Sequence, residues 1–251
     1  MRVLTCLTAA LLGTAVMLAQ PPAASAQGSV AADQSWQSCI SATTPPDDKA
    51  AACSAIIDAK RETGSKLAAA YCFRGHGLTE KRQLDAALSD LNESIRLDPT
   101  SACALTNRGR VYAFKRDLDR AIADYDEAIR VDPAFALAYN NRGDAYRDGE
   151  QLDRAAADYG EVIKLAPTDA RGWRNRGMIK LFKGDTKGGL ADYDKALQYD
   201  PADAYSWNNR GQARMRLGDK AGAIADFRKA LKISPGLRIA SESLQRLGAA
   251  Q

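Results

Sequence analysis

The sequence predicts an all-α protein, a solenoid of stacked helical hairpins, and two observations carry this prediction. The first is a set of prolines spaced 34 residues apart: Pro99, Pro133, Pro167, Pro201 and Pro235. A fixed period between about 20 and 50 residues is typical of a stacked repeat array. The second is that Gly, Arg, small and aromatic residues fill the same positions in every period. We therefore expect five tandem repeats.

The repeats align in one register when each proline is taken as position 32. The five repeats then span 68–101, 102–135, 136–169, 170–203 and 204–237. Position 7 is always Arg and position 8 always Gly, while position 20 is Ala or Gly and position 24 is Leu, Tyr or Phe. The Arg residues are Arg74, Arg108, Arg142, Arg176 and Arg210, and the Gly residues are Gly75, Gly109, Gly143, Gly177 and Gly211. Agreement of several columns at one period excludes chance.

Each repeat reads as two helices. In repeat 102–135 the first helix is expected from Ala102 to about Lys115, and the second follows Asp119 as its N-cap and ends before Pro133. Apolar residues of the second helix recur at spacings of three and four, which predicts one buried stripe. A Gly inside the first helix costs ~1 kcal/mol relative to Ala. We therefore expect this Gly to face a small residue of the second helix in a close contact.

The repeat pattern resembles a known family. Repeat 102–135 carries Leu105, Gly109, Tyr112, Ala121, Tyr125, Ala128 and Pro133. These residues are similar to the consensus of the tetratricopeptide repeat family, a helix–turn–helix unit of 34 residues. The resemblance covers 68–237, in the variant with an Asn-Arg-Gly signature. It departs from the family at position 11, where Lys180 and Arg214 replace the usual Tyr, and at position 7, where Arg replaces Leu.

The two ends of the array differ from the repeats, as capping segments must. Residues 27–67 are expected to form an N-terminal linker and helical cap, and 238–251 a C-terminal capping helix. Cys39 and Cys53 flank a turn between two short predicted helices, which would bring them together. The resemblance implies that the helices carrying Cys72 and Cys103 run side by side. Of three possible pairings, we favour two disulfides, Cys39–Cys53 and Cys72–Cys103.

The N-terminus predicts export. Arg2 precedes the apolar stretch Leu4–Ala19, and Ala24-Ser25-Ala26 provides a signal-peptidase site, so 1–26 reads as a cleaved signal peptide. A retained anchor is the alternative. The mature chain is expected to be soluble, periplasmic or secreted, with no membrane insertion. Its oligomeric state is not predicted.

Composition and chemistry argue against several classes of function. Acidic and basic residues are interspersed along the chain and the net charge is only +4, which gives no case for nucleic-acid binding. His76 is the only histidine, and no serine or cysteine stands in the context of a nucleophile with a base, so the chain is not expected to be an enzyme. A zinc site of His76, Cys72 and Cys103 lacks an apparent fourth ligand. We expect no cofactor and no metal.

The resemblance implies a concave groove lined by positions 2, 5, 6, 9, 12 and 13 of the first helices. Position 6 forms an Asn ladder: Asn107, Asn141, Asn175 and Asn209. An amide side chain offers a donor and an acceptor, which matches the backbone of an extended peptide. The alternative is that these Asn residues pair locally within the fold. The other candidate groove residues are Asn140, Arg147, Arg171, Arg174, Tyr205 and Asn208.

A second repeated pair is expected to be structural. An Asp follows each repeat Arg by sixteen residues: Asp90, Asp124, Asp158, Asp192 and Asp226. We expect Arg–carboxylate pairs near the helix interface, although arginines free to bind an acidic ligand are the alternative. The leading function is a scaffold that holds a partner protein or extended peptide. The alternative is a chaperone-like or regulatory subunit of an envelope enzyme or assembly complex.

Overall fold

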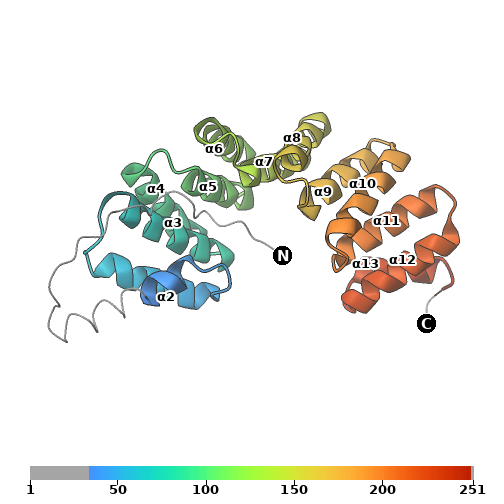
Figure 1. The fold of residues 1–251 in the computed structure, drawn as a ribbon, viewed down its shortest axis with the longest axis horizontal. Coiled ribbons are helices and arrows are strands. Elements are labelled where there is room, and N and C mark those ends of the chain that lie inside the picture. The colour runs from blue at the N-terminus through green and yellow to red at the C-terminus, as the bar shows by residue number, and fades with distance from the viewer. Residues whose placement is uncertain (1–33, 250–251) are drawn as a thin grey trace, which may run out of the picture. The chain divides into compact units, whose positions relative to one another are not determined.

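The computed structural model of the chain describes residues 34–249, in which every regular element is a helix (Figure 1). Residues 34–40 are helical. They are followed by α2 (Pro46–Asp58), α3 (Gly64–Glu80), α4 (Leu84–Leu97), α5 (Ala102–Phe114), α6 (Leu118–Val131), α7 (Ala136–Asp148), α8 (Leu152–Leu165), α9 (Ala170–Phe182), α10 (Thr186–Tyr199), α11 (Ala204–Arg216), α12 (Lys220–Ile233) and α13 (Arg238–Arg246). The predicted fold class, five helical hairpins between a disulfide-linked cap and a capping helix, is confirmed.

The chain divides into two compact units, one ending at Asp132 and the other beginning at Pro133. Within each unit, successive helices pack as antiparallel pairs and the pairs stack on their neighbours. The predicted signal peptide, 1–26, lies outside the described residues. Within 34–249, no helix has both the length and the apolar character needed to span a membrane.

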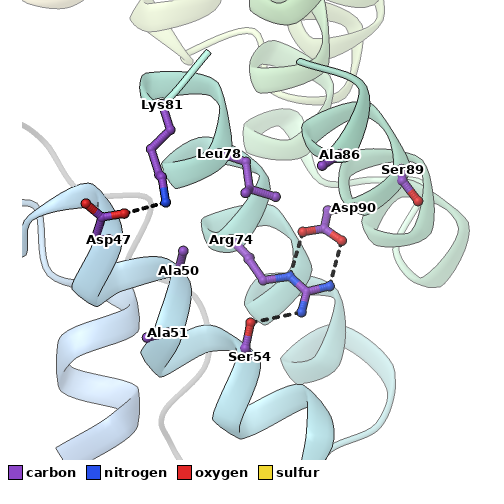
Figure 2. Close-up of a pocket in the computed structure, with 10 residues that line it drawn as sticks. All are labelled: Asp47, Ala50, Ala51, Ser54, Arg74, Leu78, Lys81, Ala86, Ser89 and Asp90. Atoms are coloured by element: carbon purple, nitrogen blue, oxygen red, sulfur yellow. Dashed lines mark hydrogen bonds and ion pairs between the residues drawn. The ribbon is translucent and has the colours of Figure 1, made fainter. Parts of the chain in front are cut away.

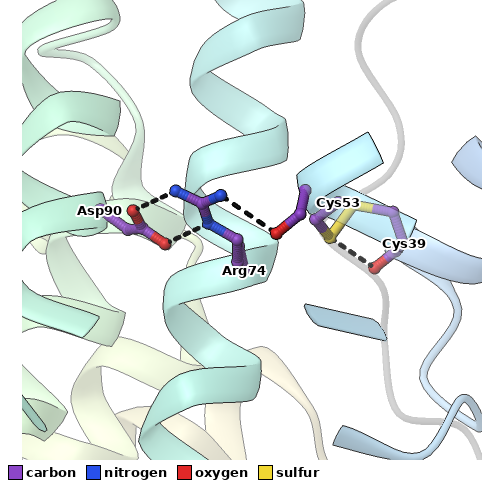
Figure 3. Close-up of a disulfide and its surroundings, with 5 residues drawn as sticks. Cys39, Cys53, Arg74 and Asp90 are labelled. Atoms are coloured by element: carbon purple, nitrogen blue, oxygen red, sulfur yellow. Dashed lines mark hydrogen bonds and ion pairs between the residues drawn. A yellow bond between two sulfur atoms is a disulfide. The ribbon is translucent and has the colours of Figure 1, made fainter. Parts of the chain in front are cut away.

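The first predicted disulfide is present. Cys39 and Cys53 are bonded, with their Cα atoms 4.9 Å apart, and the bridge ties the short helix at 34–40 to α2 (Figure 3). Both cysteines are fully buried and share a hydrophobic cluster with Ile56 of α2 and Ala70 of α3. The two helices of the N-terminal cap are therefore covalently linked to each other and packed against the first repeat.

The second predicted disulfide is not formed in this structure. Cys72 of α3 and Cys103 of α5 face each other with their sulfurs 3.6 Å apart, well beyond a bond of about 2.05 Å. The amide of Asn107 donates to both sulfurs, at 3.4 and 3.6 Å. The resemblance correctly placed these helices side by side. No cluster of three or more His, Cys, Asp or Glu residues able to hold a metal occurs within 34–249.

The repeat glycines permit a close contact, but with a different partner from the one expected. A Cβ on Gly109 would lie 2.6 Å from Cε1 of Tyr125 and 3.0 Å from the carbonyl oxygen of Ala121. The aromatic ring at position 24 therefore lies directly against the glycine, and the small residue at position 20 contributes mainly its backbone. These rings are fully buried and form the centres of four hairpins: Tyr125, Tyr159, Tyr193 and Phe227. Leu91 stands at the same position in the first repeat.

Helix ends follow local side-chain chemistry. The N-cap of α6 is Asp117, whose carboxylate accepts from the backbone N–H of Arg120, so the expected cap at Asp119 is wrong by two residues. The loop aspartates Asp185 and Asp219 cap α10 and α12 in the same way. At the C-terminus, α13 buries Ala240 and Leu244 in the cluster around Phe227.

The Arg–Asp columns form ion pairs in all five repeats. Arg142 donates from Nε and Nη2 to Asp158, at 2.9 and 2.7 Å, and each of the other four arginines makes the same two-pronged contact. The five aspartates are buried. Arg74 also donates from Nη1 to Ser54 of the N-terminal cap, so this pair links the first repeat to α2 (Figure 2). The structural interpretation of these columns is confirmed.

Candidate binding face of the second unit

The first helices of the three repeats in the second unit are α7, α9 and α11, and α9 contacts α11 directly. Among the described residues, Phe182 and Tyr205 are the most exposed large hydrophobic side chains, at 63% and 56%. Phe182 occupies position 13 of its repeat on α9, and Tyr205 occupies position 2 on α11. Leu137 of α7 is also exposed. We call the surface carrying these side chains the first-helix face.

The Asn ladder divides into two kinds of rung. Asn175 is 7% exposed, and its Nδ2 donates to Oδ1 of Asn140 in the preceding repeat at 3.1 Å. Asn107 is similarly buried and donates to the two thiols. Asn141 and Asn209 are only half-buried. The amides of Asn107 and Asn175 thus bond within the fold, whereas Asn141 and Asn209 remain accessible.

The residues at position 5 lie deeper than the sequence indicated. Asn140 is 9% exposed and Asn208 only 2%. Each donates through Nδ2 to the next residue, Asn140 to Asn141 at 3.4 Å and Asn208 to Asn209 at 3.1 Å. These contacts orient the carboxamides of Asn141 and Asn209, the accessible rungs. Asn140 and Asn208 therefore support the face from beneath.

The three arginines expected to form a basic subsite are each paired with a local carboxylate. Arg147 donates to Asp144 at 2.8 Å, and Arg174 donates to Asp203 at 3.0 Å. Arg171 pairs with Asp169 at 2.6 Å. Burial acts to raise the pKa of Asp169, but the hydrogen bonds from Arg171 outweigh it, so this pKa lies below its ordinary value. The positive charge of each of these arginines is therefore balanced by a neighbouring carboxylate.

A buried tyrosine pair distinguishes two repeats of this unit. The hydroxyl of Tyr159 donates to Oδ1 of Asp144 at 2.7 Å. The hydroxyl of Tyr193, at the same position of the next repeat, is buried and makes no hydrogen bond within the described part of the chain. Met178 occupies the position that Asp144 occupies one repeat earlier. Our sequence reasoning missed this difference, although comparison of positions 9 and 24 across the repeats could have found it.

The first unit contains a cavity of about 560 Å³ between α2, α3 and α4 (Figure 2). Its charged lining groups are already paired: Arg74 bonds Asp90 and Ser54, and Lys81 pairs with Asp47. Its remaining lining residues are small or apolar: Ala50, Ala51, Leu78, Ala86 and Ser89. This cavity is a less suitable ligand site than the first-helix face.

Solved structures with this fold are repeat proteins. YrrB, described as a TPR protein with an unusual peptide-binding site, has a TM-score of 0.57 at 21% identity, covering 78% of this chain and 99% of its own. PilF of Pseudomonas aeruginosa has a TM-score of 0.63 at 19% identity, covering 72% and 86%. PilW, described as a type IV pilus biogenesis factor, has a TM-score of 0.66 at 17% identity, covering 74% and 88%.

No curated protein sequence matches this chain at a significant level. A family model does match. The tetratricopeptide repeat model aligns with residues 106–170 and 174–237, just over half of the chain, in the register of its helical hairpins. The chain therefore belongs to the tetratricopeptide repeat family.

Proposed function

We propose that this protein is a non-catalytic scaffold that binds an extended segment of a partner protein on the first-helix face of its second unit. The observation that carries the proposal is the exposure of Phe182 and Tyr205 on the contacting helices α9 and α11. Aromatic side chains bury a large area on binding and are enriched where partners dock. Exposing two of them on adjacent helices favours a binding surface over an inert one.

The accessible rungs supply the polar part of this surface. Asn141 and Asn209 are half-buried, and their carboxamides are oriented by Asn140 and Asn208. Each rung can offer a donor and an acceptor to the backbone of an extended peptide. We assign Asn107 and Asn175 to the repeat junctions instead, because their amides already bond within the fold.

We place this scaffold outside the cytosol, in the periplasm or secreted. The predicted signal peptide and the disulfide between Cys39 and Cys53 support this location, since structural disulfides persist mainly in oxidising compartments. Intact-mass measurement of protein recovered from the periplasm tests it. A mature chain beginning at Gln27 is expected, and a mass that retains Met1 would overturn the assignment.

Site-specific photocrosslinking tests the binding face. A benzophenone amino acid is introduced at Phe182 or Tyr205 in cells, with Tyr199 of the second helix α10 as an aromatic control at 36% exposure. The same partner should crosslink from both first-helix sites and not from the control. Equal crosslinking from all three sites would argue against a dedicated face.

The captured partner then allows the rungs to be tested. Each accessible side-chain hydrogen bond should contribute ~0.5–1.5 kcal/mol, so the double variant Asn141→Ala, Asn209→Ala should bind about tenfold more weakly. Its melting temperature should fall somewhat, because Asn140 and Asn208 each lose an acceptor, so affinity is measured well below the unfolding transition. Asn175→Ala is the matched control and should lower stability without weakening binding. Unchanged affinity of the double variant would exclude the rungs from recognition.

A further inference from the structure

Repeat 136–169 contains a bound carboxylate of its own. Oδ1 of Asp144 accepts hydrogen bonds from the hydroxyl of Tyr159 at 2.7 Å and from Nη1 of Arg147 at 2.8 Å. Nδ2 of Asn140 lies 3.3 Å from the other carboxylate oxygen. Charged acceptors form the stronger class of hydrogen bond. This cluster shows how the hairpin holds a carboxylate over its buried tyrosine.

The next repeat has the same tyrosine without the carboxylate. Tyr193 lies against Gly177, and Tyr159 lies against Gly143, in equivalent ring-to-glycine contacts. In repeat 170–203, however, Met178 stands at the position of Asp144. The Tyr193 hydroxyl is left buried and unbonded among residues 34–249. Buried polar atoms almost always have a partner, so this hydroxyl requires an explanation.

The surroundings of Tyr193 are more basic than those of Tyr159. Arg174 stands at the position of Asn140 in the preceding repeat. Arg216 reaches from α11 to the carbonyl of Leu181, with Nη1 at 2.7 Å. Burial and, after it, the charge of Asp192 raise the pKa of the Tyr193 phenol, whereas the charges of Arg216 and Arg174 act to lower it. The hydroxyl is therefore protonated at neutral pH, and it is a donor near two guanidinium groups.

The guanidinium of Arg174 can bind a further acceptor. Arg174 donates from Nη1 to Asp203 at 3.0 Å, and its side chain is 29% exposed. A guanidinium has five N–H donors in a fixed fork, so one ion pair does not exhaust it. Met178 is only half-buried, and the flexible methionine side chain can rotate to open the space above the tyrosine.

We propose that repeat 170–203 binds a carboxylate side chain of the partner peptide, which accepts a hydrogen bond from Tyr193 and pairs with Arg174. The ligand would take the place that Asp144 takes in the preceding repeat. This inference rests on the proposed function and narrows it to partners whose extended segment is acidic. The exposed aromatic residues Phe182 and Tyr205 lie on the two helices that bear the arginines and would hold the apolar parts of such a segment.

Two labelled octapeptides test the proposal by fluorescence anisotropy with the full mature chain. One alternates Glu with Ala, and the other replaces each Glu by Gln. The Glu peptide should bind about tenfold more tightly, because hydrogen bonds to a charged group are roughly twice as strong as neutral ones. Tyr193→Phe should remove most of this preference and leave binding of the Gln peptide unchanged. Phe227 stands at this position in the last repeat, so the fold accepts the substitution.

Two matched variants complete the test. Met178→Asp introduces the internal carboxylate of the preceding repeat and should abolish the preference for Glu by occupying the subsite. Tyr159→Phe removes a hydroxyl that is already bonded to Asp144, so it should lower the melting temperature and leave the preference intact. If Met178→Asp does not fold, Tyr193→Phe alone still decides the question.

The possible outcomes distinguish failure of the scaffold proposal from failure of the carboxylate subsite. If neither peptide binds, the carboxylate subsite is wrong, and the crosslinking result alone decides the scaffold proposal. If both peptides bind equally, the scaffold stands and the carboxylate subsite is wrong. If the preference for Glu survives in both Tyr193→Phe and Met178→Asp, it arises from general charge, and the subsite is again wrong.

Discussion

In the second and third repeats a tyrosine stands beside the buried Arg–Asp pair, whereas in the fourth and fifth repeats a cation stands there. Tyr112 and Tyr146 occupy position 11 of the earlier two repeats. An arginine from the second helix stacks on each ring, Arg120 at 4.5 Å and Arg154 at 4.2 Å from the centroid. In these hairpins the extra positive charge comes from the second helix and lies on an aromatic face.

The later two repeats place the extra cation on the first helix. Lys180 donates to Asp192 and Arg214 to Asp226, each at 2.9 Å. Position 19, which carries the stacking arginine in the earlier repeats, is Gly188 or Gly222 here. Positions 11 and 19 therefore change together, and each of these four hairpins keeps one added cation. This cation lies exposed on a tyrosine ring in the earlier two hairpins and on the buried aspartate in the later two. The replacement of Tyr by a cation at position 11 is therefore accompanied by the replacement of Arg by Gly at position 19.

The largest expected effect comes from removing the acid that serves two cations. Asp226→Ala removes the buried acceptor that Arg210 and Arg214 share, leaving Arg210 only its contact with Asp194, and should cost about 3–5 kcal/mol of stability. Asp124→Ala removes the buried acceptor of Arg108 alone and should cost less. Urea unfolding monitored by circular dichroism measures both. Equal losses would contradict the distinction between the two kinds of hairpin.

A pH effect separates the two units. His76 lies in the first unit, and burial, followed by the charges of Arg110 and Lys49, lowers its pKa from 6.5 to about 4. Between these values the unfolded chain binds a proton that the folded chain does not. Stability of the first unit should therefore fall as the pH falls from 6.5 towards 4, by up to about 3 kcal/mol.

The second unit contains no histidine, so it provides an internal control for this titration. Hydrogen exchange at pH 7.5 and pH 5 should show earlier opening of α3 and α5 at the lower pH, with less change in α9 and α11. His76→Gln should remove the difference between the units. Persistence of the difference in this variant would assign it to other groups.

Exchanging the two arrangements within one hairpin should have a smaller effect. Lys180→Tyr alone removes a cation bonded to Asp192. Gly188→Arg alone adds an arginine with no ring beneath it and requires the side chain of Asp185 to shift. Together they reproduce the arrangement of the second repeat, where Asp117 stands at the position of Asp185. The double variant should be more stable than the sum of the single effects by about 0.5–1 kcal/mol, the range of an exposed cation–π contact. Additive effects would mean that the two positions are independent.

The sequence was informative where a residue's role repeats along the chain. The period of the prolines, the Gly column and the Arg–Asp spacing predicted the hairpins and their buried ion pairs, because each contact recurs in every repeat. The disulfide of Cys39 and Cys53 followed from a turn between two short helices. These predictions needed only local geometry.

The sequence was less informative where neighbouring repeats meet. Asn175 was expected to face a ligand, but its amide is used by Asn140 of the preceding repeat. Whether Cys72 and Cys103 bond depends on differences of about an ångström that no spacing encodes. The unbonded hydroxyl of Tyr193 depends on a residue from the other helix of its hairpin, Met178. Side-chain contacts between elements decide these cases.

The smallest expected effect concerns the third donor of the repeat arginines. Arg108 and Arg210 each use Nη1 to reach an acceptor on the second helix of the preceding repeat, Asn92 at 2.9 Å and Asp194 at 2.8 Å. Arg176 meets Gly160 at that position, which offers no side-chain acceptor. A Cβ added to Gly160 has no neighbour within 4 Å, so a side chain fits there.

Gly160→Asp should therefore stabilise the second unit by about 1 kcal/mol. Part of the gain comes from replacing a mid-helix glycine in α8, and the rest comes from an exposed pair with Arg176. Gly160→Asn isolates the first part, because Asn has about the helix propensity of Asp and no charge. Because a surface pair is screened by salt, the difference between the Asp and Asn variants should shrink as ionic strength rises, while the gain from Asn should not. If the Asp variant shows no salt dependence, its carboxylate does not reach Arg176, and α9 of the fourth repeat would pack against α8 of the third repeat differently from the equivalent helices of its neighbours.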